Sequence, residues 1–93
     1  MKFKLSNLAL KDLENIWLYT FETWSIDQAD KYYNLILNEL EFLSVHPNTG
    51  KDYSRVRKGY LRSKVNEHFI FYRINKKENE IEIIRITTPT NGY

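Results

Sequence analysis

The sequence predicts an α+β protein in which an N-terminal strand and a helical hairpin pack on a small, twisted, antiparallel sheet. Apolar residues recur every three to four positions through the first half of the chain, and after Pro47 this spacing changes to alternation. With 93 residues the chain has room for one hydrophobic core, so we expect a single domain over residues 1–93. The expected order of elements is β-α-α-β-β-β, with the first strand added at an edge of the sheet.

The first half of the chain contains the signals of a short strand and two helices. Lysine and apolar residues alternate over residues 2–5, which indicates a strand with one buried face. Ser6 or Asn7 offers a side-chain oxygen that can cap the first helix, and Ser25 has capping-box spacing at the start of the second. We therefore expect a helical hairpin over residues 8–45, joined by a short turn.

The second half of the chain predicts a meander of short strands. Strands are expected near residues 59–65, 67–74 and 80–87. The run HFIFYRI at 68–74 is almost continuously apolar, as in a central strand covered on both sides. In the last strand the apolar pattern shifts at Ile83 and Ile84, which indicates a bulge. Residues 87–93, TTPTNGY, are expected to form a short polar tail.

The charge of the chain is concentrated in one segment. The formal net charge is only +2, yet residues 51–64 hold three lysines and three arginines against one aspartate. Such a segment suits phosphate or an acidic partner. The chain has no cysteine, no apolar segment typical of a signal peptide and no apolar run of the roughly 20 residues that a membrane span needs. We therefore expect a cytoplasmic protein that does not enter the membrane.

The side chains with useful chemistry are mostly basic and aromatic. No serine lies in a Gly-x-Ser-x-Gly turn, the three glycines stand apart, and two histidines do not make a metal centre by themselves. We therefore expect neither a metal nor a cofactor. The residues that remain as candidates are Arg55, Arg57, Lys58, Tyr60, Arg62, Lys64, His68, Tyr72, Arg73 and Arg85.

A metal-free ribonuclease can be built from such groups, because arginine stabilises a pentacoordinate phosphate while a tyrosine, lysine or histidine moves protons. If the chain is a nuclease, its catalytic candidates are Arg62, Arg73, Arg85 and Tyr72. The alternative is that these are ordinary solvent-side residues of a sheet. The three arginines fall on three consecutive expected strands, but alternation alone does not require them to face the same way.

In their order and spacing these features resemble the ParE toxins of bacterial toxin–antitoxin systems, within the RelE/ParE superfamily. The resemblance covers about residues 3–86. It rests on the opening strand with Leu5 and Ser6, on Pro47 and Gly50 after the helices, and above all on HFIFYR at 68–73 with IIRI after it. Each piece is weak alone, but their order along the whole chain makes the resemblance specific.

The resemblance implies a cytoplasmic toxin that a ParD-like antitoxin neutralises in a hetero-oligomer. ParE relatives poison DNA gyrase, whereas RelE relatives cut messenger RNA in the ribosome, and the HFIFYR signature favours the ParE branch. The chain is then more a binding protein than an enzyme. Tyr32 and Tyr33 are neighbours on a helix and about 100° apart, so one of them is expected at the surface or in an interface. The partner-binding candidates are Arg55, Arg57, Tyr60, Arg62, His68, Tyr72, Arg73, Arg85, Tyr32 and Tyr33.

The C-terminus departs from the family pattern, which continues after the last strand with a tail that contains histidine and arginine. Here the chain continues as TTPTNGY. Three readings follow: a gyrase-directed toxin, a ribosome-dependent endoribonuclease, and an attenuated protein that still binds an antitoxin.

Overall fold

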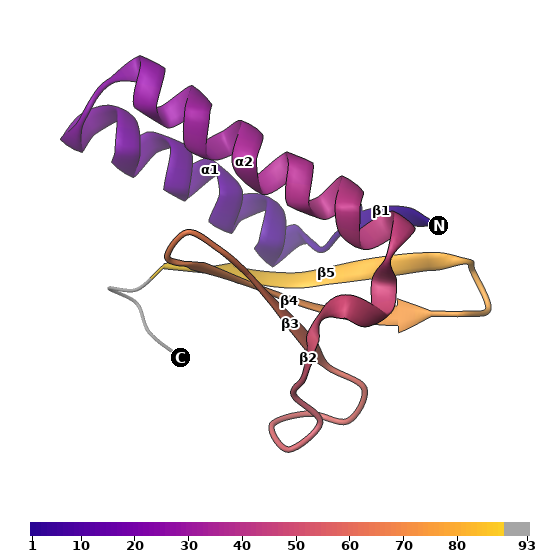
Figure 1. The fold of residues 1–93 in the computed structure, drawn as a ribbon. Coiled ribbons are helices and arrows are strands. Elements are labelled where there is room, and N and C mark those ends of the chain that lie inside the picture. Colours follow the sequence, from indigo (N-terminus) through magenta and orange to yellow (C-terminus); the bar gives the residue numbers. More distant parts are fainter. Residues whose placement is uncertain (89–93) are drawn as a thin grey trace.

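The protein consists of two layers, a helical hairpin and the five-stranded sheet that it covers on one face (Figure 1). The computed structural model describes residues 1–88. The strands lie in the order β1-β5-β4-β3-β2, and a single 3-10 turn links the helices to the sheet. The elements are β1 (Lys2–Leu5), α1 (Asn7–Thr23), α2 (Ile26–Val45), η1 (Pro47–Thr49), β2 (Lys51–Asp52), β3 (Leu61–Val65), β4 (His68–Asn75) and β5 (Glu80–Thr87).

The predicted α+β class and the helical hairpin are confirmed, but the sheet is mixed and not antiparallel throughout. β1 pairs in parallel with β5, so that Phe3 lies opposite Ile81. The chain between these strands passes through the helices and three strands, and no tight turn forces them to be antiparallel. The sheet also contains β2, which was not expected because two residues are too few to show alternation. Thr87, the first residue of the expected polar tail, ends β5, and residues 89–93 of that tail lie outside the described part.

Both helices begin at serines whose side chains accept a backbone N–H. The Ser6 hydroxyl accepts from the N–H of Ala9 at 3.0 Å and donates to the carbonyl oxygen of Ile84 at 2.7 Å. Ser25 accepts from the N–H of Gln28 at 3.1 Å. Such caps satisfy N–H groups that have no partner inside the helix. Ser6 therefore also attaches the start of α1 to β5.

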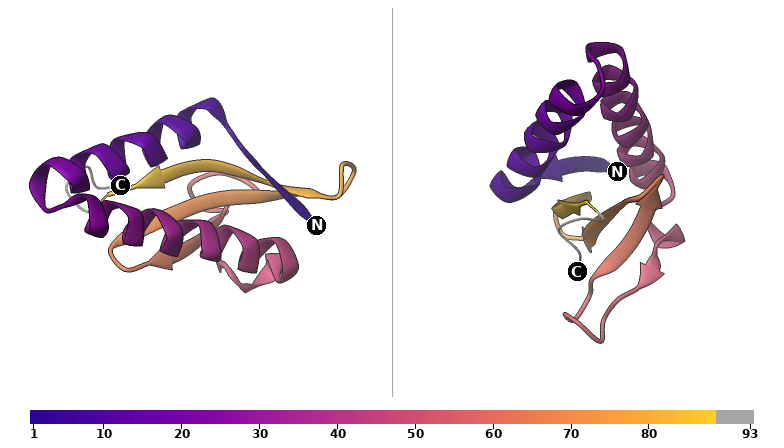
Figure 2. Two further views of the ribbon diagram at one scale, coloured as in Figure 1. Left: turned by 90° about the horizontal axis from the view of Figure 1, so that it is seen from above. Right: turned by 90° about the vertical axis from the view of Figure 1, so that its left-hand side faces the viewer.

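Figure 2 shows from two further directions that the hairpin lies over one face of the sheet. The core lies between these two layers. The periodic apolar positions of both helices and alternate residues of the two central strands supply it. Its fully or almost fully buried members are Ala9, Leu13, Ile16, Ile36, Leu40, Leu43, Ile70, Tyr72, Ile81, Ile83 and Ile86. Within residues 1–88, no helix is both long and apolar enough to cross a membrane.

The bulge expected in the last strand is present and sets which residues reach each face. Phe71 lies opposite Arg85, whereas the next residue of β4, Tyr72, lies opposite Ile83. Ile84 is therefore the extra residue, and its carbonyl oxygen is the one that accepts the Ser6 hydroxyl. The bulge keeps Ile83 in the core while it places Arg85 beside Phe71.

Candidate partner-binding surfaces

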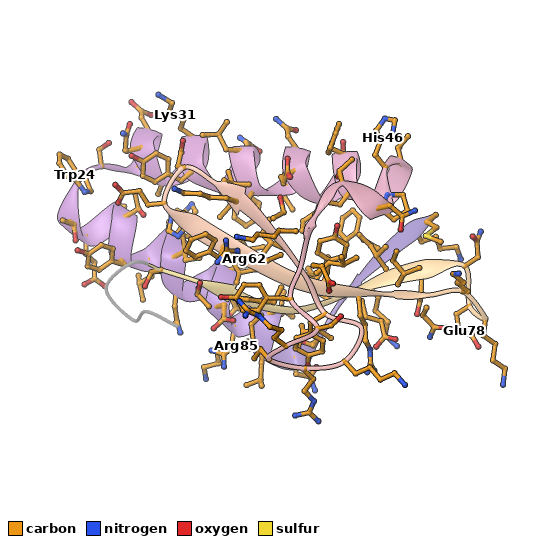
Figure 3. All side chains as sticks on the ribbon, turned by 60° about the horizontal axis from the view of Figure 1, so that its bottom comes forward. Trp24, Lys31, His46, Arg62, Glu78 and Arg85 are labelled. Carbon is orange, nitrogen blue, oxygen red and sulfur yellow. The ribbon has the colours of Figure 1, made fainter. Side chains whose placement is uncertain are left out.

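The strand register brings the three candidate arginines to one face of the sheet. Arg62 of β3 and Arg85 of β5 both lie opposite Phe71 of β4, and Arg73 follows two residues later on the same side. This side faces away from the helices, and we call it the open face. Figure 3 brings it forward, with Arg62 and Arg85 labelled.

On the open face, Arg62 is held by aromatic rings and not by a carboxylate. Its guanidinium carbon lies 4.8 Å from the ring centroid of Tyr53 and 4.4 Å from that of Phe69. Its Nη1 also donates to the Tyr53 hydroxyl at 3.4 Å, and the Tyr53 ring meets Phe71 edge-on at 5.5 Å. Within residues 1–88 no carboxylate forms an ion pair with Arg62. The rings fix the direction of this cation while its charge stays available.

Arg73 shares the open face but is already paired. Its Nη2 lies 3.1 Å from Oε2 of Glu82, and Asn75 donates to the other carboxylate oxygen at 3.2 Å. The hydrogen bond from Arg73 lowers the pKa of Glu82. The Arg73 side chain is 51% exposed, so water screens the pair and its contribution to stability is small.

Arg85 has a structural partner that the sequence did not reveal. Its Nε and Nη2 donate to the two carboxylate oxygens of Asp12 on α1, at 2.7 and 2.9 Å. Asp12 also accepts the backbone N–H of Ile86 at 3.0 Å. β1 ends opposite Ile83, so at Ile86 the Asp12 carboxylate accepts a backbone N–H that no neighbouring strand accepts. Asp12 and Arg85 are 73 positions apart in the sequence, and no local spacing indicates their contact.

Two further candidates, His68 and Tyr72, lie on the helix side of the sheet. The His68 ring stands edge-on to Tyr32 of α2 with centroids 6.4 Å apart, and its Nδ1 lies 3.2 Å from the carbonyl oxygen of Thr87. Tyr72 is fully buried, and this burial raises the pKa of its hydroxyl. Neither residue can act together with the arginines of the opposite face. The burial of Tyr72 therefore favours a structural role over the partner-binding or proton-transfer role expected from the sequence.

The Tyr72 hydroxyl fastens the end of the hairpin to the sheet. It donates to the carbonyl oxygen of Pro47 at 2.7 Å and accepts the N–H of Gly50 at 3.0 Å. A Cβ atom on Gly50 would overlap the hydroxyl and the ring of Tyr72. This contact explains the glycine that follows the second helix, because a larger residue would overlap Tyr72.

Tyr33 faces a different surface from its neighbour Tyr32. It lines an open groove between α1 and α2 of about 330 Å³, together with Glu14, Trp17 and Asp30. The indole Nε1 of Trp17 donates to Asp30 at 3.0 Å, which holds the indole across the two helices. We call this feature the hairpin groove.

Arg55, Arg57 and Tyr60 belong to the connection between β2 and β3, which projects away from the two layers (Figure 1). Arg55 and Arg57 are exposed, whereas Tyr60 is half-buried. The candidate residues are thus divided among the open face, the helix side, the hairpin groove and this projecting loop. In the described part of the chain no three His, Cys, Asp or Glu side chains cluster in a way that could hold a metal ion.

Comparison with known proteins identifies the family. Residues 3–88 match the family described as the ParE toxin of the type II toxin–antitoxin system parDE. Toxin ParE1 of Caulobacter vibrioides is 33% identical over 84 residues, which span 90% of this chain and 84% of that toxin. Toxin ParE1 of Mycobacterium tuberculosis is 29% identical over 85 residues, covering 91% of this chain and 86% of the relative.

Two solved structures share the fold. A chain of the chromosomal ParDE toxin–antitoxin system from P. aeruginosa superposes with a TM-score of 0.81 at 21% identity, over 95% of both chains. A chain of the toxin–antitoxin complex RelBE2 from Mycobacterium tuberculosis reaches 0.65 at 19% identity, over 94% of this chain and 95% of that one. The family match over almost the whole chain, supported by this fold, shows that the protein belongs to the ParE toxins of type II toxin–antitoxin systems.

Proposed function

We propose that this toxin acts by inhibiting DNA gyrase and that a cognate ParD-like antitoxin holds it inactive in a hetero-oligomer. The observation that carries the proposal is the ParE family match over residues 3–88. The distribution of the candidate groups agrees with a binding protein. Tyr72 is in the core and His68 lies on the helix side, so neither stands beside the arginines of the open face.

Within this proposal Arg62 is the residue of the open face that contacts the target. It is the one of the three candidate arginines without a carboxylate partner in residues 1–88, and two aromatic rings fix its direction. Arg73 and Arg85 serve mainly to hold Glu82 and Asp12. A partly exposed cation of this kind contributes a contact that salt weakens, because charges are screened over about 10 Å at 0.1 M salt.

The test uses purified toxin, purified gyrase and relaxed plasmid. We expect loss of supercoiling or accumulation of cleaved DNA, and no cleavage of ribosome-bound message. Arg62→Ala should weaken the inhibition, whereas Lys76→Ala, an exposed cation in the turn between β4 and β5, should leave it unchanged. Codon-specific cleavage of message with gyrase unaffected would refute the gyrase assignment and favour the ribonuclease.

We further propose that the antitoxin lays an apolar helix in the hairpin groove. Trp17 and Tyr33 line the groove, and the exposed ring of Phe21 stacks on Trp17 with ring centroids 5.3 Å apart. An amphipathic helix buries its apolar face in a groove of this kind. The relatives that share the fold come from structures of a ParDE system and of a RelBE2 toxin–antitoxin complex, which supports an antitoxin partner.

Co-expression with the product of a neighbouring small gene tests the antitoxin site. We expect Trp17→Ser to reduce the antitoxin that copurifies with the toxin. Trp24→Ser is the matched control, because Trp24 is 72% exposed at the turn of the hairpin and does not line the groove. Equal retention of antitoxin by both variants would exclude the groove as the docking site. Since both proposed partners act in the cytoplasm, the proposal places the toxin there.

A further inference from the structure

The segment of residues 51–64, which we call the basic segment, has an excess of positive charge that the fold does not neutralise. It contains six cationic side chains and a single carboxylate, Asp52. Within the segment this carboxylate accepts from Ser54, whose hydroxyl and backbone N–H donate to its Oδ1 at 2.6 and 2.9 Å. The same hydrogen bonds, that from the hydroxyl first, lower the pKa of Asp52.

The arginines of the basic segment differ from the others in the chain. Arg73 and Arg85 each have a carboxylate partner, at 3.1 and 2.7 Å. The other three, at positions 55, 57 and 62, form no ion pair within residues 1–88. The fold thus gives carboxylate partners to the arginines of β4 and β5 and none to those of the basic segment, where Arg62 is held by aromatic rings instead.

The projecting part of the basic segment has a defined backbone. The N–H of Tyr53 donates to the carbonyl of Tyr60 at 2.8 Å, which continues the pairing of β2 with β3. Inside this closure the N–H of Val56 bonds to the Tyr53 carbonyl at 3.0 Å, and the N–H of Tyr60 bonds to the Arg57 carbonyl at 3.0 Å. Gly59 closes the turn with φ of +83°, a left-handed value that favours glycine. The cations therefore stand on a preformed projection and not on a random coil.

We propose that the basic segment binds the phosphate backbone of duplex DNA. Arg55, Arg57 and Lys58 on the projection, with Arg62 and Lys64 at its base, present donors to successive phosphates, and the planar guanidinium group matches a phosphate with two parallel hydrogen bonds. Binding of this kind gains free energy by release of counterions and needs little apolar area.

An acidic polypeptide fits the projection less well than DNA does. Protein interfaces depend on a buried apolar centre. The projection offers only one exposed large apolar side chain, Val56, which is 66% exposed. This inference goes beyond inhibition of gyrase, because it concerns direct contact with DNA in the absence of any enzyme.

The test measures fluorescence anisotropy of a labelled 20-base-pair duplex with purified toxin between 50 and 200 mM NaCl. The variant Arg55→Gln/Arg57→Gln/Lys58→Gln removes the cations of the projection. The control Lys31→Gln/Lys76→Gln/Lys77→Gln removes three exposed cations from α2 and the turn between β4 and β5. Both variants lower the formal net charge by three, from +2 to −1. Any difference in DNA binding between the two variants therefore reflects where the cations lie and not the net charge.

We expect the first variant to bind the duplex at least about ten-fold more weakly at 50 mM NaCl. The slope of log binding constant against log salt concentration should become less steep by up to about 2.7, because each of three phosphate contacts contributes about 0.9. The control should bind nearly as well as the unaltered toxin. No binding of duplex by the unaltered toxin at 50 mM NaCl would overturn the proposal, as would equal losses in the two variants. Displacement of the DNA by polyglutamate at an equal concentration of negative charges would also overturn the proposal, and it would indicate an acidic polypeptide as the ligand instead.

Discussion

Removing the hydroxyl of Tyr72 tests whether this residue is structural, as its burial indicates, or functional, as the sequence suggested. Tyr72→Phe keeps the buried ring but deletes the group that donates to Pro47 and accepts from Gly50. Each such hydrogen bond contributes about 0.5–1.5 kcal/mol net, so the two together predict a loss of about 1–3 kcal/mol in the free energy of unfolding. In a domain of this size, 1 kcal/mol lowers Tm by about 4–8 °C.

Urea unfolding followed by circular dichroism measures this loss, with Tyr19→Phe as the control. Tyr19 is 61% exposed on α1, so its variant should unfold at the same urea concentration as the unaltered toxin. Under conditions in which Tyr72→Phe is folded, it should still inhibit gyrase, because the buried Tyr72 hydroxyl of the unaltered toxin is not accessible to a partner. An unchanged urea midpoint together with lost inhibition would refute the reasoning and return Tyr72 to the functional site.

The unaltered toxin and Tyr72→Phe should also differ in how their free energy of unfolding depends on pH. Burial raises the pKa of folded Tyr72 above the unfolded value of about 10. The unfolded state then loses its proton first, so this stabilisation is fully present below pH 10 and is lost as pH rises through the folded pKa. The unaltered toxin should therefore lose stability more steeply above pH 10 than Tyr72→Phe does, while lysine titration affects both alike.

Three further changes probe the packing. Leu40→Ala empties a fully buried site on α2 and should cost about 2–5 kcal/mol in urea unfolding, whereas an unchanged midpoint would place Leu40 outside the core. Gly50→Ala pushes a methyl group into the Tyr72 ring and should cost about 1–3 kcal/mol, and an increase in Tm would show that the ring can move aside. Asp12→Asn keeps an acceptor for the backbone but loses the charged pair with Arg85, at an expected cost of about 1.5–3 kcal/mol, and equal stability at low salt would contradict this role.

The sequence predicted the order of the elements apart from β2, and it did so best for the helices, because both carry their own signals. The apolar stripe of α2 runs from Ala29 to Leu43, and Ser25 caps its start. Such patterns extend over a few turns of one element, so they can be read without knowledge of distant residues. The bulge near Ile84 was predictable for the same reason, since a break in alternation is also local.

The sequence also identified the arginines of the strands, but only the tertiary structure showed which face and which partner each one has. The register placed Arg62 and Arg85 opposite the same residue, and the helix–sheet contact gave Arg85 a carboxylate 73 positions away. Tyr72 was named among the partner-binding candidates because a central strand with apolar residues on both faces does not show which face the core covers. The direction of β1 and the partners of the charged side chains depend on contacts between segments far apart in the chain. The local periodicity of the sequence does not depend on those contacts, so they are determined only when the hairpin packs on the sheet.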